Sequence, residues 1–279
     1  MLISTHIFDE HEKFMRDFRA AKPFPHLVFD RFIPNWNELN EIFPDSNWTS
    51  WRSLGDIYQK NKFTCSDISK MPERLKQVFQ ELSSPSFLES LERVTGIKGL
   101  IPDPYLEGGG LHLSLGGGQL APHTDFHVYE KLGLFRRLNL IVYLSEDWKD
   151  GDGGELELSI PGDLSPVAIV EPIGGRAVIF ETTDTSVHGF RNLVREGTRR
   201  PSLAVYYYTS YETESFSGDQ TTHWRDHGVV SWRKRPRFIA YKVLMKISRF
   251  FSIVAHVANP NQGLGLLRSR LNDMKTSND

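Results

Sequence analysis

The sequence predicts a mainly β protein with flanking helices, built as an antiparallel sandwich or barrel. From Leu111 onward, short apolar or alternating runs recur between Gly and Asp turns, which is typical of antiparallel strands. Before that point, two stretches have the apolar spacing of helices, as expected of supporting elements. The 279 residues are 39% hydrophobic and 12% aromatic, so they can bury one sizeable core. We therefore expect one domain with an appendage.

The first third of the chain is expected to be mixed. An apolar strand is predicted within residues 23–34, where Pro34 ends it. A helix capped by Asn35 is predicted over residues 35–43. Residues 69–96 have helical spacing that is broken near Pro85.

The later strands are predicted from apolar or alternating runs bounded by turn residues. They cover residues 111–115, 137–144, 154–160, 166–172, 176–182 and 201–209. The glycines of GDGGELEL, residues 151–158, indicate a turn with positive φ angles, because no helical pattern follows that would complete a phosphate-binding loop.

Composition excludes several classes of protein. Cys65 is the single cysteine, so an intrachain disulfide, a zinc ribbon and a Cys-x-x-Cys redox site are all excluded, and a reducing, cytoplasmic compartment is expected. The N-terminus has acids and a histidine where a signal peptide would have a basic start and an apolar run. A net charge of -2 gives no reason to expect a nucleic-acid partner.

The stretch QLAPHTDFHVYE contains three candidate metal ligands, His123, Asp125 and His127. They would share one face only if the segment stays extended, so spacing alone does not choose among them. His188 follows another apolar strand, and Arg200 opens the next one. Two histidines and a carboxylate on one face of a metal leave positions open, as in non-haem Fe(II) oxygenases. A guanidinium at Arg200 could offer two parallel donors to a carboxylate.

At these motifs the chain resembles the Fe(II)- and 2-oxoglutarate-dependent dioxygenases, in particular their prolyl 4-hydroxylase-like branch. The resemblance runs from about Phe24 to about Tyr211 and rests on five motifs in family order. They are GGGQLAPHTD, FRRLNLIVYLSEDW, GDGGELELS, GGRAVIFETTDTSVHGF and TRRPSLAVYYYT. The resemblance implies a double-stranded β-helix, or jelly roll. It also implies Fe(II), 2-oxoglutarate and O₂, with ascorbate as an optional cofactor, and hydroxylation of an unactivated C–H bond with release of succinate and CO₂.

The resemblance also implies roles for individual residues. The implied metal ligands and catalytic residues are His123, Asp125 and His188. Arg200 is implied to bind the distal carboxylate of 2-oxoglutarate, and Tyr143 to help hold it. His127 matches no family ligand, and Ser114 stands where many collagen-type relatives carry a tyrosine.

Strand alternation extends this set of co-substrate residues. It places Arg200 and Ser202 on one face and Arg199 on the other. Asn139 faces the same way as Tyr143, either lining the co-substrate pocket or packing as a polar strand residue. Two further arginines, Arg136 and Arg137, are interpreted as a solvated rim in preference to a contact for an anionic substrate.

The chain is expected to comprise an N-terminal segment over 1–23, the jelly-roll domain over 24–211, and a basic helical extension over 212–279. Residues 231–251 contain seven Lys or Arg and no acid, with apolar residues at helical intervals. Two interpretations stay open. The helix lies on an anionic membrane surface, or it packs against a sheet face or a homodimer partner.

The complete set of ligands and Arg200 favours an active hydroxylase. A non-catalytic jelly-roll binding module would be expected to lack at least one of these residues. A metal hydrolase on a cupin-like barrel would have no use for Arg200 and Tyr143. The substrate stays open among a prolyl residue in a protein, an amino acid or peptide, and a sugar or lipid-linked metabolite, because loops and termini choose it.

Overall fold

The computed structural model describes residues 2–4, 8–211 and 222–224, and single positions between 236 and 254. The chain divides into two compact units, Met1–His227 and Gly228–Asp279. In the second unit the described positions are helical and exposed. Within the described part of the chain, no helix has the length and apolar character needed to cross a bilayer.

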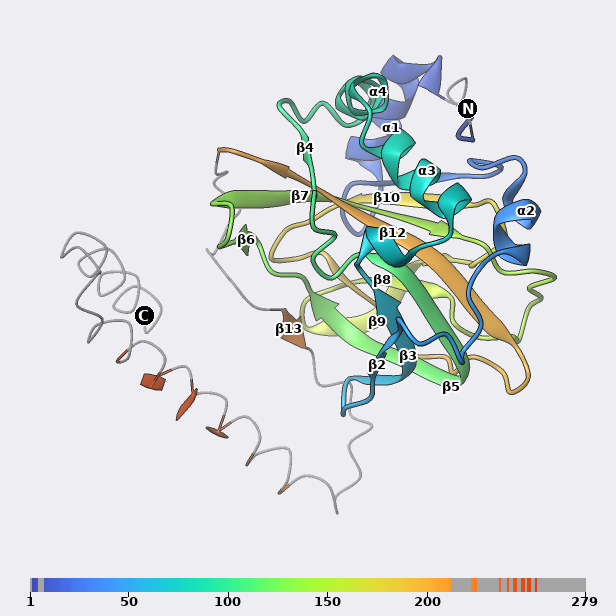
Figure 1. The fold of residues 1–279 in the computed structure, drawn as a ribbon. Coiled ribbons are helices and arrows are strands. Elements are labelled where there is room, and N and C mark those ends of the chain that lie inside the picture. Colours follow the sequence, from blue (N-terminus) through green and yellow to red (C-terminus); the bar gives the residue numbers. More distant parts are fainter. Residues whose placement is uncertain are drawn as a thin grey trace. The chain divides into compact units, whose positions relative to one another are not determined.

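The strands of the first unit form a curved, nearly closed antiparallel sheet, the predicted double-stranded β-helix (Figure 1). Neighbours follow the order β1 (His26–Phe29), β10 (Ala177–Glu181), β7 (Leu134–Tyr143), β12 (Arg199–Thr209), β5 (Gly110–Thr124), β11 (Val187–Phe190), β8 (Leu156–Ile160) and β9 (Asp163–Val170). Shorter strands extend it: β2 (Arg52–Leu54), β3 (Gln59–Cys65), β4 (Ile101–Pro102), β6 (Val128–Tyr129) and β13 (His223–Trp224). Strand β3 pairs with both β2 and β5.

Strand β5 belongs to both halves of the jelly roll. Its first part pairs with β12 and β3, and its second part pairs with β11. The sequence predicts only residues 111–115 as strand, followed by a glycine-rich turn, but the strand continues through the glycines to Thr124. Gly117 has a φ of +73°, and a Cβ at Gly116 would lie 2.5 Å from a carboxylate oxygen of Glu196. The glycines therefore permit a bend without ending the strand.

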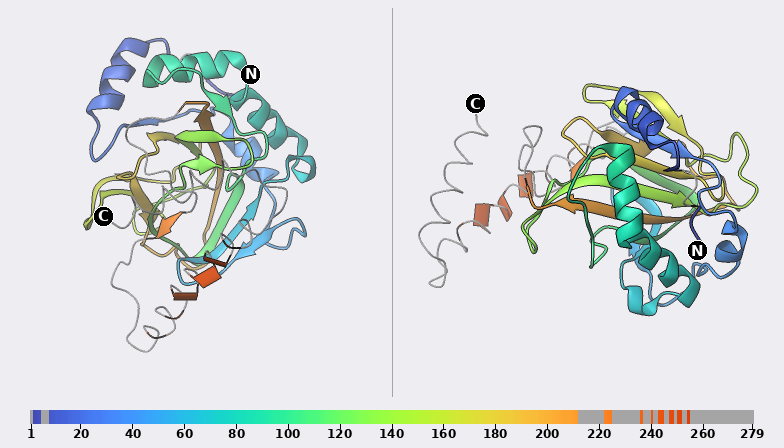
Figure 2. Two further views of the ribbon diagram at one scale, coloured as in Figure 1. Left: turned by 90° about the vertical axis from the view of Figure 1, so that its left-hand side faces the viewer. Right: turned by 90° about the horizontal axis from the view of Figure 1, so that it is seen from above.

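Helices cover one face of the sheet (Figure 2). They are α1 (His11–Ala20), α2 (Trp36–Glu41), α3 (Glu73–Leu82) and α4 (Pro85–Thr95), with the 3₁₀ helix η2 (Ile68–Lys70) before α3. The main core lies between the helices and this face, where β7 contributes Leu138, Leu140 and Val142. The alternate β7 residues, among them Tyr143, face the interior between the two halves of the roll.

Pro85 separates α3 from α4, as the sequence predicts. The Ser84 hydroxyl accepts a hydrogen bond from the Phe87 N–H at 3.3 Å, and Pro85 occupies the first turn, where its missing N–H costs nothing. The helix ends at Gly96 in the left-handed region, with a φ of +76°.

Two predictions for the first third need correction. The predicted strand within residues 23–34 is confined to His26–Phe29, and the helix predicted over 35–43 is confined to Trp36–Glu41. Helix α1 lies inside the segment 1–23, for which the sequence predicts no element, and its Phe18 belongs to the main core. The expected turn at GDGGELEL is confirmed by positive φ angles at its glycines.

Candidate active site

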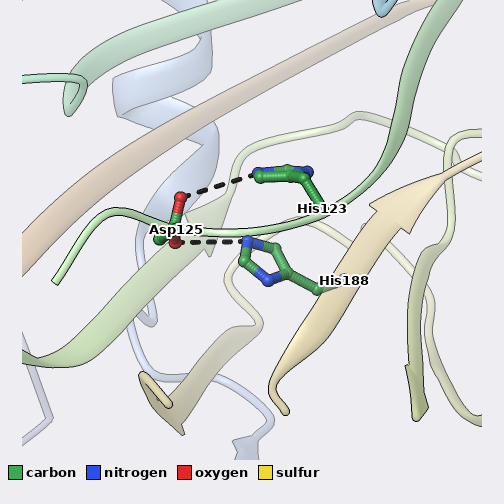
Figure 3. A group of neighbouring side chains, drawn as sticks. All are labelled: His123, Asp125 and His188. Carbon is green, nitrogen blue, oxygen red and sulfur yellow. Dashed lines mark ion pairs between the residues drawn. The ribbon is translucent and has the colours of Figure 1, made fainter. Parts of the chain in front are cut away.

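Three buried side chains converge where β5 and β11 meet. His123, near the end of β5, and His188, on β11, are direct cross-strand partners. One ligand atom from each of them and one from Asp125 lie within 4.8 Å of one another. The carboxylate oxygens of Asp125 are 3.6 Å from Nε2 of His123 and 3.4 Å from Nε2 of His188 (Figure 3).

The position at which β5 ends explains why His123 and Asp125 lie together and His127 does not. The strand stops at Thr124, so alternation does not continue to His127. The buried His127 ring has its Nδ1 3.0 Å from an oxygen of Asp184, and it is absent from the group formed by the other three side chains. The structure therefore places His188, not His127, with His123 and Asp125.

Backbone carbonyls orient both imidazoles. Nδ1 of His123 lies 2.9 Å from the carbonyl oxygen of Ala121, and Nδ1 of His188 lies 2.9 Å from that of Ser186. A proton on each Nδ1 donates to the carbonyl and leaves the lone pair of Nε2 directed at the centre of the group. Burial and the neighbouring His123 lower the pKa of His188 to about 4, so its imidazole is neutral near pH 7.

Arg136 and Asn139 hold the carboxylate of Asp125. Arg136 Nη2 donates to Oδ2 at 2.9 Å, and Asn139 Nδ2 donates to the same oxygen at 2.7 Å. Arg136 Nε also donates to the Asn139 carbonyl oxygen at 2.9 Å, which closes the network. Burial alone would raise the pKa of Asp125, but Arg136 and the imidazoles hold it well below its ordinary value. The carboxylate of Asp125 is thus oriented and ionised, as a metal ligand would need to be.

The interpretation of Arg136 as a solvated rim is wrong. Its side chain is 1% exposed, and its guanidinium carbon lies 3.4 Å from the centre of the Tyr206 ring. Period-2 counting would place Arg137 with Asn139, but the pairing of β7 with β12 shifts between Tyr207 and Tyr208. This bulge turns Arg136 inward. Arg137 is also buried, and it pairs with Glu181 at 3.4 Å.

The buried side chain of Arg200 lies at the end of the interior opposite to the three converging side chains. Arg200 is 7% exposed, and its Nε donates to the Gly154 carbonyl at 2.6 Å, which leaves the terminal nitrogens for a ligand. Its guanidinium carbon is 4.9 Å from the ring centre of Tyr143 and 4.4 Å from that of Phe190. Arg199 is exposed and donates to Asn40, as strand alternation predicts.

Two other predicted co-substrate residues lie at this end. Ser202 is buried and is the cross-strand partner of Tyr143. Burial raises the pKa of Tyr143, and Arg200 offsets part of that effect. The fully buried Tyr143 hydroxyl has no well-aligned hydrogen-bond partner among the described residues. The Asn139 amide, in contrast, donates to Asp125 and accepts from Arg136. These contacts place it beside the three converging side chains and not beside Arg200.

A pocket of about 350 Å³ opens beside the three converging side chains. His123 and Asp125 form part of its wall together with Arg136 and Tyr206. Strand β3 contributes Lys62, which sequence reasoning missed because QKNKFTC has neither an apolar nor a clearly alternating pattern. A donor set of two imidazoles and one carboxylate fits Fe(II), and three protein ligands would leave positions for other groups.

Comparison with known families agrees with this donor set. Residues 110–208 match the family model of the 2OG-Fe(II) oxygenase superfamily. These residues include the three converging side chains, Tyr143 and Arg200. The match covers about a third of the chain, and over these residues the chain is similar to the 2OG-Fe(II) oxygenase superfamily. It is a 2-oxoglutarate-dependent dioxygenase, for which the family implies Fe(II), 2-oxoglutarate and O₂.

Solved structures share the fold of this oxygenase. A prolyl-4-hydroxylase from Pseudomonas putida superimposes with a TM-score of 0.50 at 16% identity, covering 70% of this chain and 98% of its own. The epimerase SnoN from nogalamycin biosynthesis, described as non-haem and α-ketoglutarate-dependent, gives 0.50 at 12% identity, covering 80% and 88%. HygX from Streptomyces hygroscopicus, solved with nickel and 2-oxoglutarate, gives 0.47 at 15% identity, covering 76% and 96%.

The Arg136 network leads to a prediction about metal affinity in this oxygenase. Arg136→Ala removes one of two donors to Asp125 Oδ2 and leaves the carboxylate less firmly oriented. We expect Fe(II) affinity to fall by roughly 10- to 100-fold, as is common when a partner of a metal ligand is lost. Anaerobic Fe(II) titration measures the change.

Arg137→Ala is the matched control. It removes a neighbouring buried arginine that pairs with Glu181 instead of Asp125. Both variants should be checked for folding by thermal unfolding. Equal losses of metal affinity in the two folded variants would contradict the role of Arg136 as a residue that positions Asp125.

Proposed function

We propose that this oxygenase hydroxylates an unactivated C–H bond and releases succinate and CO₂ from 2-oxoglutarate. The observation that carries the proposal is the convergence of His123, Asp125 and His188 within 4.8 Å, in an interior that also holds the buried Arg200. A metal-binding module without turnover would have no need for Arg200 beside Tyr143.

The chain's own residues would position the reactants. His123, His188 and Asp125 would hold Fe(II), which when bound supplies the O₂ activation that is coupled to decarboxylation of 2-oxoglutarate. Arg200 would receive the distal carboxylate, with the Tyr143 hydroxyl and Ser202 beside it. The apolar side chains of Phe180 and Leu158 would keep water from the interior.

Cell extract incubated with the enzyme, Fe(II) and 2-oxoglutarate tests the proposal. Untargeted mass spectrometry should find products that have gained one oxygen atom, together with succinate, and His188→Ala protein serves as the control. Succinate without any oxygenated product from any extract fraction would contradict hydroxylation. A prolyl residue, an amino acid or peptide, and a sugar or lipid-linked metabolite are the substrate classes to search. Comparing reactions with and without ascorbate tests that proposed cofactor.

A peripheral membrane contact through residues 231–251 is a second proposal. The described residues there are helical, and Val243, Leu244, Ile247, Phe250 and Phe251 are 44–63% exposed. Their spacing is that of one helix face, and the surrounding sequence is basic. Charge complementarity therefore favours an anionic lipid surface.

Sedimentation with vesicles tests this contact. The protein should bind phosphatidylserine-containing vesicles and lose most binding when Phe250 and Phe251 are replaced by Ser. Binding should also fall as salt rises, since screening weakens the attraction. Absence of vesicle binding together with a dimer in analytical ultracentrifugation would favour the homodimer interpretation instead.

A further inference from the structure

Lys62 and Arg200 share one side of the sheet. Lys62 on β3 is the cross-strand partner of Ser114 on β5, and Ser114 is in turn the partner of Arg200 on β12. Direct partners in antiparallel strands point to the same face. Ser114 is 1% exposed, so this face is the interior of the roll. A small side chain thus lies between two long cationic ones.

Lys62 has no anionic partner in the described part of the chain. No carboxylate there lies within ion-pair distance of its ammonium, and the acid that acts on it most, Asp125, already pairs with Arg136. Burial and the guanidinium of Arg200 lower the pKa of Lys62 to about 8, and Asp125 opposes this effect only in part. Lys62 is half-buried and Arg200 is buried, and two neighbouring cations repel each other unless an anion lies between them.

The acids that line the pocket are paired, and Arg52 adds an exposed cation to its wall. Asp67 pairs with Lys70 at 3.4 Å, and Glu107 pairs with Lys131 at 3.3 Å. Burial, Lys62 and Arg200 hold the pKa of His112 well below its ordinary value, so His112 adds no charge near pH 7. The interior beside Ser114 therefore carries two positive charges. The buried acid that acts on Arg200, Glu155, accepts a hydrogen bond from Asn192 at 3.3 Å, and no described carboxylate lies within ion-pair distance of Lys62 or Arg200.

We propose that Lys62 is a second cationic ligand for the distal carboxylate of 2-oxoglutarate, opposite Arg200 across Ser114. The inference rests on the proposed function, since it needs 2-oxoglutarate in this interior. It assigns to β3, a strand outside the matched residues 110–208, a part in co-substrate binding. Lys62 would add a point charge to the two-pronged contact of Arg200.

Anaerobic titration of the Fe(II) protein with two oxo acids tests the assignment through the metal-chelate absorption band. 2-Oxoglutarate has the distal carboxylate, and 2-oxopentanoate has a methyl group in its place. Lys62→Met should lower the affinity for 2-oxoglutarate roughly tenfold or more, as the loss of a hydrogen bond to a charged group does. It should leave the affinity for 2-oxopentanoate nearly unchanged. Lys60→Met is the matched control, because Lys60 is an exposed lysine on the same strand.

Each other outcome overturns the assignment. Unchanged 2-oxoglutarate affinity in Lys62→Met would show that Lys62 does not bind the distal carboxylate. An equal loss of affinity for both oxo acids would show that Lys62→Met affects chelation at the metal or the fold, and not the distal carboxylate. Failure of the unmodified protein to form a chelate with either oxo acid would instead contradict the proposed function, so the two failures are distinguishable.

Discussion

Replacing His188 by alanine should abolish 2-oxoglutarate turnover while the jelly roll stays folded. The imidazole would be one of three side-chain ligands in the described part of the chain, so its loss would remove a strong donor from Fe(II). The ring lies at the junction of β5 and β11, 4.7 Å from the centre of the Phe180 ring, and outside the main core beneath the helices. Succinate formation measures turnover, and thermal unfolding reports on the fold.

His127→Ala is the control for this experiment. His127 is as buried as the ligands and lies two residues after Asp125, yet it stands outside the group of converging atoms. Its replacement should preserve Fe(II) binding, with a loss no larger than roughly 10- to 100-fold through altered support of Asp125. Loss of Fe(II) binding in His127→Ala together with full turnover in His188→Ala would show that the wrong histidine has been assigned.

Arg200→Ala should raise the concentration of 2-oxoglutarate required for chelation by orders of magnitude. The guanidinium is buried beside Tyr143, and its removal leaves a partly buried carboxylate without its charge-assisted partner. Such truncations cost roughly 2–5 kcal/mol, or about 30- to several thousand-fold in affinity. Fe(II) affinity should hardly change. Anaerobic titration of the chelate band measures both quantities.

Two further variants separate charge from geometry at this position. Arg200→Lys should recover only part of the affinity, because an ammonium keeps the charge without the two parallel donors. Arg199→Ala should have little effect, since Arg199 is exposed and bonded to Asn40. If Arg199→Ala lost chelation and Arg200→Ala kept it, Arg199 and not Arg200 would be the side chain that binds the co-substrate.

Strand alternation predicted the interior correctly wherever the pairing is regular. Between Leu138 and Tyr143, β7 pairs with β12 without interruption, so counting by twos placed Asn139 and Tyr143 on the interior face. The same rule separated Arg200 from Arg199. The fold class followed from the recurrence of such strands.

The sequence could not predict what depends on irregular pairing or on distant partners. A bulge brings Arg136 inward, and no local pattern announces that shift. Lys62 reaches the interior only because β3 pairs with β5, far away in the sequence. The four residues of β11 are too few to show a period, although they carry His188. Helix α1 is largely polar, so the anchoring of its Phe18 in the core was not apparent.

Under the proposed function, strand β5 would determine the distance between the metal site and the residues that bind the distal carboxylate. Ser114 lies beside Arg200, and His123 lies beside His188, so one strand spans both ends of the interior. The bend of β5 between Ser114 and His123 has no room for a side chain at Gly118. A Cβ there would lie 2.6 Å from the Leu115 carbonyl oxygen. The backbone of β5 would therefore help to set the length of oxo acid that fits between Arg200 and the metal site.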